Sequence, residues 1–172
     1  MIITADTFIF QIDTNGVKQM QYIPHLNIYA ENLITYSANI KKADILKVIQ
    51  HIHDNLSALG LAAAGRFIFT FKENNISDET QSAEIYIPVK GEIKPSENYG
   101  SKLIFRLINA VMTRHEGSIA DISRTETALK DYIQENNFEP VTNAYYVVVR
   151  NGDTFGSDCV FEVYIGINYN SL

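Results

Sequence analysis

Two glutamates stand at the same place in two matching stretches, and they are the most conspicuous candidates for chemistry in this chain. Glu84 opens the stretch Glu-Ile-Tyr-Ile-Pro, and Glu162 opens the stretch Glu-Val-Tyr-Ile-Gly. Alternate side chains of an extended strand point to the same face, so each glutamate should share a face with the tyrosine two positions later, Tyr86 or Tyr164. Two interpretations follow: a contact with a ligand in a groove, or a place at a solvated edge of the sheet.

The other reactive side chains form no catalytic or metal-binding pattern that can be recognised from the sequence. His51 and His53 lie two residues apart on an expected helix, roughly 200° around its axis, and do not share a face as an i, i+4 metal-binding pair does. His115 could act as a general base, but no serine or cysteine nucleophile is recognisable beside it. Cys159 lies in an apolar segment, where we expect a buried, inert thiol. We therefore assign no catalytic residue, no metal and no cofactor.

The composition is that of an ordinary globular protein and argues against two classes of partner. The 172 residues are 46% hydrophobic and 20% charged, and the formal net charge is -6. Nucleic-acid affinity comes mainly from lysine and arginine neutralising phosphates, so we expect no nucleic-acid partner. No stretch approaches the roughly 18 apolar residues of a membrane span, and the start lacks a basic region followed by a long apolar run. We expect a cytoplasmic protein without a membrane partner.

The matching stretches belong to a longer repeat with an offset of about 77 residues. Each copy begins with an apolar strand, continues with an amphipathic helix, and ends with a second apolar strand, a polar turn and the Glu-x-Tyr-Ile strand. We place the first β-α-β-β unit at residues 28–90, a linker at 91–101 and the second unit at 102–170, together forming one domain. Residues 1–27 should add a β-hairpin at one edge.

This order of elements defines the expected fold class, which is α+β. Two such units can join their sheets side by side, with the helices on one face and a concave antiparallel surface on the other. The second helix has two candidate starts, because Ser118 to Asp121 and Ser123 to Glu126 both have the spacing of a capping box. The second unit's first strand is long enough to suggest a bulge. A groove where the units meet is the default position for a binding site.

Short motifs of the second unit resemble those of a known family. These are Val-Met-Thr-Arg-His-Glu-Gly at 111–117, Asn-Phe-Glu-Pro at 137–140 and the closing strand that begins at Glu162. In this order, around one helix, they are similar to the GyrI-like, or bacterial effector-binding, domain, which also consists of two β-α-β-β units. The resemblance covers residues 28–168. It implies a pocket at the junction of the units for small hydrophobic or cationic molecules, in a sensor or a free-standing protein. It also implies that some free-standing relatives hydrolyse small hydrophobic compounds.

The resemblance also places two family positions on this sequence. The family's strand after the second helix usually carries a glutamate that points into the pocket, and the matching position here is Tyr146. The family's second helix often bears a tryptophan; this chain has none, and Tyr132 lies closest to that position. Tyr145 and Tyr146 should point to opposite faces of their strand, so that one of them faces the groove.

These observations give one preferred function and two alternatives. The preferred function is non-catalytic binding of a small, largely apolar or aromatic molecule in the groove between the units. The first alternative is a protein interaction module that kept the scaffold and lost the ligand site, with a homodimer left open; the second is a hydrolase of small hydrophobic compounds. The candidate ligand-binding residues are Tyr36, Tyr132, Tyr146, Tyr164, Glu84 and Glu162.

Overall fold

The structure is a computed structural model that describes residues 20–72, 80–94, 96–151 and 158–168. It confirms the α+β class: two α-helices accompany eight mostly antiparallel strands among the described residues. The first half contains β1 (Tyr22–Ile40), the 3-10 helix η1 (Lys42–Asp44), α1 (Ile45–Asn55), β2 (Ala62–Ala63), β3 (Ile68–Phe71) and β4 (Gln81–Lys90). The second contains β5 (Gly100–Gly117), η2 (Ile119–Asp121), α2 (Ile122–Glu135), β6 (Glu139–Pro140), β7 (Tyr145–Arg150) and β8 (Cys159–Asn168).

The two halves have the same element order, and the predicted strand-helix-strand-strand plan of each unit is confirmed. Each unit adds a short 3-10 helix before its α-helix and a two-residue strand after it, which the apolar periodicity did not indicate. Ser118 caps the entry to η2, because its hydroxyl accepts a hydrogen bond from the Ala120 amide at 3.2 Å. The alternative capping box from Ser123 to Glu126 does not form, since the Glu126 carboxylate turns towards Tyr146 instead.

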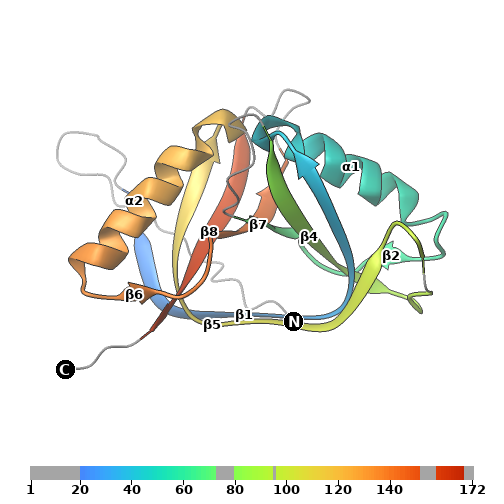
Figure 1. Cartoon of the computed structure of the whole chain (residues 1–172), viewed down its shortest axis with the longest axis horizontal. Helices are drawn as coiled ribbons and strands as arrows, with labels where there is room; N and C mark the ends of the chain where they lie inside the picture. Colours follow the sequence, from blue (N-terminus) through green and yellow to red (C-terminus); the bar gives the residue numbers. More distant parts are fainter. Residues whose placement is uncertain (1–19, 73–79, 95, 152–157, 169–172) are drawn as a thin grey trace.

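Six strands pair in the ring β1-β5-β8-β7-β3-β4, and β4 pairs back with β1. The long strands β1 and β5 form a ribbon along the base of the molecule in Figure 1, with α1 and α2 above it on opposite flanks. Residues 22–35 of β1 pair with β5, whereas residues 33–40 pair with β4, so β1 belongs to both halves of the ring. The bulge expected in β5 is present as the register shift between Leu26 and Ile28, and a second shift, between Ile23 and Leu26, has its extra residue in β1.

The first strand extends further towards the N-terminus than the repeat indicated. β1 begins at Tyr22, and residues 22–27 continue into it without a turn, because they pair with β5. Residues 1–19 of the predicted hairpin lie outside the described residues, as do most of the two polar turn regions.

Strand alternation sorts the buried side chains into two layers. The first, here called the helix-facing core, lies between the sheet and the helices. The second, here called the inner core, lies on the opposite, concave face, and all six strands of the ring contribute to it. The inner core comprises Ile28, Ala30, Leu33, Ile68, Tyr86, Phe105, Leu107, Ala110, Met112, Val147 and Tyr164. Side chains therefore pack the concave face.

Neither helix in the described part of the chain combines the length and the hydropathy needed to cross a membrane.

Candidate ligand-binding site at the junction of the units

The two units meet at the pair of strands β3 and β7. Phe69 on β3 lies directly opposite Tyr146 on β7, and their rings stack with centroids 4.9 Å apart and planes 15° apart. Both rings belong to the helix-facing core, whereas the neighbouring Tyr145 packs against the inner core. The predicted opposite orientation of the two tyrosines is confirmed, and Tyr146 is the one that faces the helices.

A cavity of about 120 Å³, here called the junction cavity, opens beside Tyr146 and takes its walls from both units. Tyr146 and Glu126 come from the second unit; Phe71 of β3 and Lys42 of η1 come from the first. The complete lining is Lys42, Phe71, Lys72, Gln81, Glu126, Asn143, Ala144 and Tyr146. The site therefore exists only where the two units are joined.

Glu126 is the carboxylate of the junction cavity. Its Oε2 accepts a hydrogen bond from the Tyr146 hydroxyl at 2.5 Å, and its Oε1 lies 2.9 Å from the Lys130 ammonium. Burial by itself would raise the pKa of Glu126, but the hydrogen bonds from Tyr146 and Lys130 and the charges of Lys130 and Lys42 outweigh it and hold the pKa below its usual value. Burial and the adjacent carboxylate raise the pKa of Tyr146 far above its ordinary value. At neutral pH the pair is thus an ionised acid bound to a neutral phenol.

A lysine supplies positive charge to this cavity from within the chain. The Lys42 ammonium lies 5.5 Å from the centre of the Phe71 ring and donates a hydrogen bond to the Ser123 hydroxyl at 3.4 Å. A cation above an aromatic face is attracted by the negative potential of the ring. Carboxylate, aromatic ring and ammonium thus come together between the units.

A second cavity, of about 300 Å³, is the counterpart of the junction cavity under the repeat. It is lined by Ile49, Gln50, His53, Arg66, Phe67, Val148, Val149 and Asn151. With the offset of about 77 residues, Ile49 takes the place of Glu126, and Arg66 takes the place of Asn143. The two cavities therefore differ at positions that the repeat inferred from the sequence makes equivalent, and of the two linings only that of the junction cavity contains an acid.

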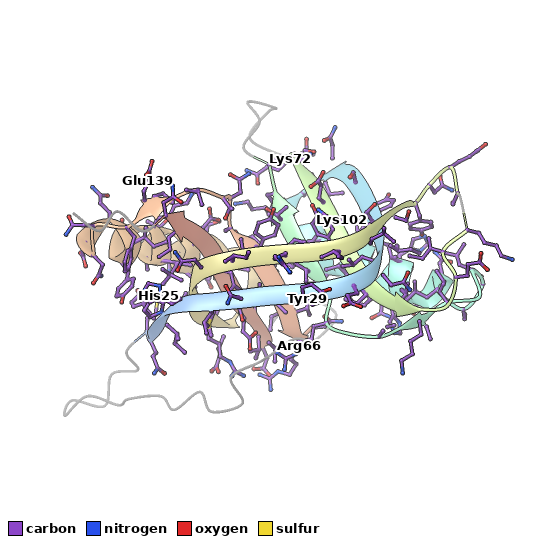
Figure 2. All side chains as sticks on the ribbon, turned by 90° about the horizontal axis from the view of Figure 1, so that it is seen from below. His25, Tyr29, Arg66, Lys72, Lys102 and Glu139 are labelled. Atoms are coloured by element: carbon purple, nitrogen blue, oxygen red, sulfur yellow. The ribbon has the colours of Figure 1, made fainter. Side chains whose placement is uncertain are left out.

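The two predicted glutamates face the inner core rather than the junction cavity. The Tyr86 hydroxyl donates to Glu84 at 2.6 Å, and the Tyr164 hydroxyl donates to Glu162 at 3.0 Å. Lys72 Nζ lies 2.7 Å from Glu84, and an Arg66 guanidinium nitrogen lies 3.2 Å from Glu162. The two cations lie on opposite sides of the β1–β5 ribbon in Figure 2.

These pairs differ in exposure. The Glu84 side chain is partly exposed, whereas Glu162 is 5% exposed and its charge is enclosed by its partners. The hydrogen bonds from Lys72 and from Tyr86 lower the pKa of Glu84. Burial, followed by the effect of the neighbouring glutamate, raises the pKa values of both tyrosines well above their usual range. Each glutamate is already paired with groups of the protein itself.

The remaining predicted residues lie in separate places. Tyr36 packs beside Tyr99 in a cavity against α1, while Tyr132 on α2 stacks on Tyr22. Of the six candidates, only Tyr146 lines the junction cavity. Glu126, the acid of this cavity, was missed, because the sequence pattern had suggested a capping role for it.

The other two potentially reactive residues, His115 and Cys159, are both buried. His115 is buried, with Nδ1 2.7 Å from the Thr125 hydroxyl and Nε2 2.9 Å from the Ser118 carbonyl oxygen. These bonds tie the end of β5 to the start of α2. Cys159 is fully buried, as predicted. Within the described ranges, no three His, Cys, Asp or Glu side chains come together in a way that could hold a metal ion.

Comparison with solved structures identifies the class of fold. The C-terminal domain of EcmrR superposes with a TM-score of 0.67 at 14% identity, covering 87% of this chain and 98% of that one. EcmrR in complex with DNA gives a TM-score of 0.74 at 11% identity, with 87% of this chain and 57% of that one covered, so the chain spans a little over half of that EcmrR chain. A protein described as a hydrolase from Listeria innocua gives 0.51 at 8% identity, with coverages of 87% and 92%. The fold is that of a divergent GyrI-like domain, which confirms the resemblance drawn from the sequence.

The sequence itself belongs to a narrower group. Residues 29–170 match the family DUF5085, a domain of unknown function, and the chain is a member of that family. No curated protein matches the sequence.

Proposed function

We propose that this protein binds a small, largely apolar or aromatic molecule at the junction cavity, and that it prefers one with a positive charge. The observation that carries the proposal is the Glu126–Tyr146 pair: an ionised, largely buried carboxylate held by a phenol beside the Phe71 ring, between the two units. The likeness to the C-terminal domain of EcmrR supports a GyrI-like scaffold for such a site.

The preference for a cation follows from the position of Lys42. Its ammonium lies near both the aromatic face and the carboxylate, where a ligand cation would be stabilised. An aromatic cation with delocalised charge is more weakly hydrated than an ammonium, so it loses less solvation on entering the site. Such a ligand would displace the lysine side chain and leave it to solvent.

The volume of the cavity is consistent with this exchange. About 120 Å³ is less than the roughly 300 Å³ at the lower end of ordinary ligand pockets. Lys42 is only partly buried and lies at one wall, so moving its side chain outwards enlarges the space without disturbing the sheet. We expect Lys42→Ala to bind small aromatic cations more tightly than the unchanged protein does.

Quinoline and N-methylquinolinium test the proposal, because they have nearly the same shape and differ in charge. Isothermal titration calorimetry at pH 8 should show tighter binding of the quinolinium. Glu126→Gln should remove most of that difference, whereas Glu135→Gln, at an exposed position of the same helix, should leave it unchanged. The proposal fails if the wild-type protein binds neither compound, or if Glu126→Gln leaves the charge preference intact.

Protein interaction is the second candidate, and one specific surface favours it. The packed inner core closes the concave face, while Leu103, Ile104 and Ile108 of β5 are exposed apolar side chains. Figure 2 shows this ribbon from below, with Tyr29 and Lys102 on its two strands. Sedimentation velocity tests a homotypic contact: dimerisation that Ile104→Asp abolishes supports it. A monomer at all concentrations, with no stoichiometric partner in native extracts, counts against the candidate.

Hydrolysis has less support among the described residues. Glu84 and Glu162 are each held by a tyrosine and a cation, and the buried His115 is bound by Thr125 and Ser118. None of these groups lines the junction cavity. Binding without turnover therefore remains the preferred function.

A further inference from the structure

A larger cavity lies against α1 and shares no lining residue with the junction cavity or with the second cavity. It has a volume of about 540 Å³, within the range of roughly 300 to 1,000 Å³ that is typical of ligand pockets, and is here called the α1 cavity. One wall is the β1 residue Tyr36 and the linker residue Tyr99, whose ring centroids are 5.7 Å apart. The complete lining is Tyr36, Lys47, Val48, His51, Ile52, Asn55, Ala58, Leu59, Asn98 and Tyr99.

The repeat shows what occupies the equivalent place in the other unit. Under the offset of about 77 residues, Tyr22 corresponds to Tyr99, and Tyr132 on α2 corresponds to Asn55 on α1. Tyr22 and Tyr132 stack closely, with centroids 4.3 Å apart and planes 13° apart. An aromatic ring supplied by α2 thus fills the space beside Tyr22.

The strand register establishes that these positions are equivalent. Ile23 pairs with Met112 in the β1–β5 ribbon, and its counterpart Gly100 pairs with Thr35. Tyr22 immediately precedes Ile23, and Tyr99 immediately precedes Gly100. Each tyrosine therefore lies where its strand begins to pair with the long strand of the other unit. Each then lies against that unit's helix, because Tyr22 stacks on Tyr132 of α2 and Tyr99 lines the cavity at α1.

The α1 cavity is therefore the open counterpart of a stacked aromatic pair. Asn55 is much smaller than a tyrosine, and α1 supplies no phenol ring against Tyr99; the ring beside Tyr99 is that of Tyr36 on β1, tilted by 46° rather than stacked. The group that α1 lacks is a flat aromatic ring. A ligand with such a ring can stack on Tyr99 as Tyr132 stacks on Tyr22, at an offset or tilted geometry that aromatic pairs favour.

The helix wall of the cavity selects the charge of that ligand. Lys47, His51 and Asn55 are four residues apart in turn, so they form one row along α1. The positions of His51 and Asn55 correspond to the apolar Ala128 and the aromatic Tyr132 on α2. The Asn55 amide donates to His51 Nε2 at 3.1 Å, an assignment that places the ring proton on Nδ1. No aspartate or glutamate is among the lining residues, although the Lys47 ammonium also lies 2.7 Å from the Asp44 carboxylate outside the lining. The row therefore offers the donors of His51 and Asn55 and an ammonium that a ligand carboxylate would share with Asp44.

We propose that the α1 cavity binds a small aromatic carboxylate, with its ring on Tyr99 and its carboxylate along the row formed by Lys47, His51 and Asn55. This site is separate from the proposed junction site, shares no lining residue with it, and takes a ligand of the opposite charge. The inference does not depend on the proposed function.

Three indoles with different charges test the proposal by calorimetry. Indole-3-acetate should bind more tightly than indole, and indole more tightly than tryptamine. Asn55→Tyr should fill the cavity and weaken indole-3-acetate binding at least tenfold without lowering the melting temperature. Lys47→Met should weaken it by about two- to fivefold, the range for a partly exposed ion pair. Glu135→Gln, at an exposed position of α2, should leave it unchanged.

Equal binding of indole-3-acetate by the wild-type protein and Asn55→Tyr overturns the proposal, as does tryptamine binding at least as tightly as indole-3-acetate. If Asn55→Tyr does not fold, Tyr99→Leu provides the second variant: it retains an apolar wall and removes the stacking ring. An unchanged affinity of a folded Tyr99→Leu protein for indole-3-acetate would then overturn the proposal.

Discussion

Phe69 and Tyr146 lie opposite each other across the β3–β7 pair, and their rings stack where the two halves of the chain meet. The strand register around them is symmetric. One row of paired residues across β4, β3, β7 and β8 consists of Glu84, Thr70, Tyr145 and Tyr164, and the next consists of Tyr86, Ile68, Val147 and Glu162. Each row thus has a glutamate at one end and a tyrosine at the other. The symmetry of the register does not extend to the hydroxyl groups: Phe69 has none, so of these two residues only Tyr146 donates to a carboxylate.

Removing that hydroxyl should be costly even though the ring stays in place. Tyr146→Phe leaves the stack on Phe69 but deprives the ionised Glu126 of a donor. Hydrogen bonds to charged groups contribute about 1.5–3 kcal/mol, and we expect a loss of about 2 kcal/mol in urea unfolding. Tyr132→Phe, whose hydroxyl has no hydrogen-bond partner among the described residues, is the matched control. Equal stabilities of the two variants would contradict the prediction.

The two ion pairs of the inner face should differ in their contributions to stability. Arg66→Met leaves the buried Glu162 without its cation, and losing one partner of a buried pair costs about 3–5 kcal/mol. Because Tyr164 still donates a hydrogen bond to the carboxylate, we expect a loss of stability at the lower limit of this range, about 3 kcal/mol. Lys72→Met removes the more exposed partner of Glu84 and should cost about 0–1 kcal/mol. Chemical denaturation of both variants measures the two losses of unfolding free energy. A larger loss for Lys72→Met than for Arg66→Met would contradict the prediction.

Acid should destabilise the protein through Glu84 and Glu126. The pKa values of both are lowered, Glu84 chiefly by the hydrogen bond from Lys72, and Glu126 because its hydrogen bonds outweigh the opposing effect of burial. A group with a lower pKa in the folded state stabilises the fold above its unfolded pKa of about 4.3 and loses this contribution as the pH falls through the folded value. Stability should therefore change little between about pH 7 and 5 and decrease below about pH 4.5.

A variant isolates this contribution. The double substitution Glu84→Gln with Glu126→Gln should be less stable than the wild type at neutral pH, and its stability should decrease less in acid. Unfolding midpoints measured in denaturant between about pH 3 and 7 provide the comparison. Parallel curves for the two proteins would show that other groups dominate.

The link between β5 and α2 gives a further prediction. Thr125→Val preserves the shape of the side chain but removes the group that His115 Nδ1 contacts at 2.7 Å in a buried position. An unsatisfied buried polar group costs about 1–3 kcal/mol. Thr127→Val, which removes a hydrogen bond to the Ser123 carbonyl at an exposed site of the same helix, should cost less. Thermal unfolding of the two variants should therefore show the lower midpoint for Thr125→Val.

Much of the fold was predictable because it depends on local patterns. The two amphipathic helices, the closing strands and the alternation of Tyr145 and Tyr146 followed from periodicity, and the structure confirms them. The extent of β1 was not predictable from these patterns. Residues 22–27 have a turn-like composition with a proline, and they become strand only because β5, far along the chain, pairs with them.

The site was less predictable, for a similar reason. Lys42 and Glu126 are charged residues on opposite units, and a sequence pattern for each alone indicates only a solvated face or a helix cap. Their common cavity arises when β3 pairs with β7 and brings η1 towards α2. Conversely, Glu84 and Glu162 stood out in apolar strands, yet the structure supplies each with a tyrosine and a cation. Tertiary pairing determines which acids are available to a ligand.

The shared strand β1 has a consequence for how the chain folds. Its pairing with both β4 and β5 closes the ring, and the contact between Tyr22 and Thr113 joins residues separated by more than half of the chain. Forming such distant contacts requires the closure of long loops before they contribute stability, which slows folding. A fragment ending before β5 would expose the pairing edge of residues 22–35. Neither half should therefore fold independently. During synthesis, the first unit should become stable only after β5 has emerged from the ribosome.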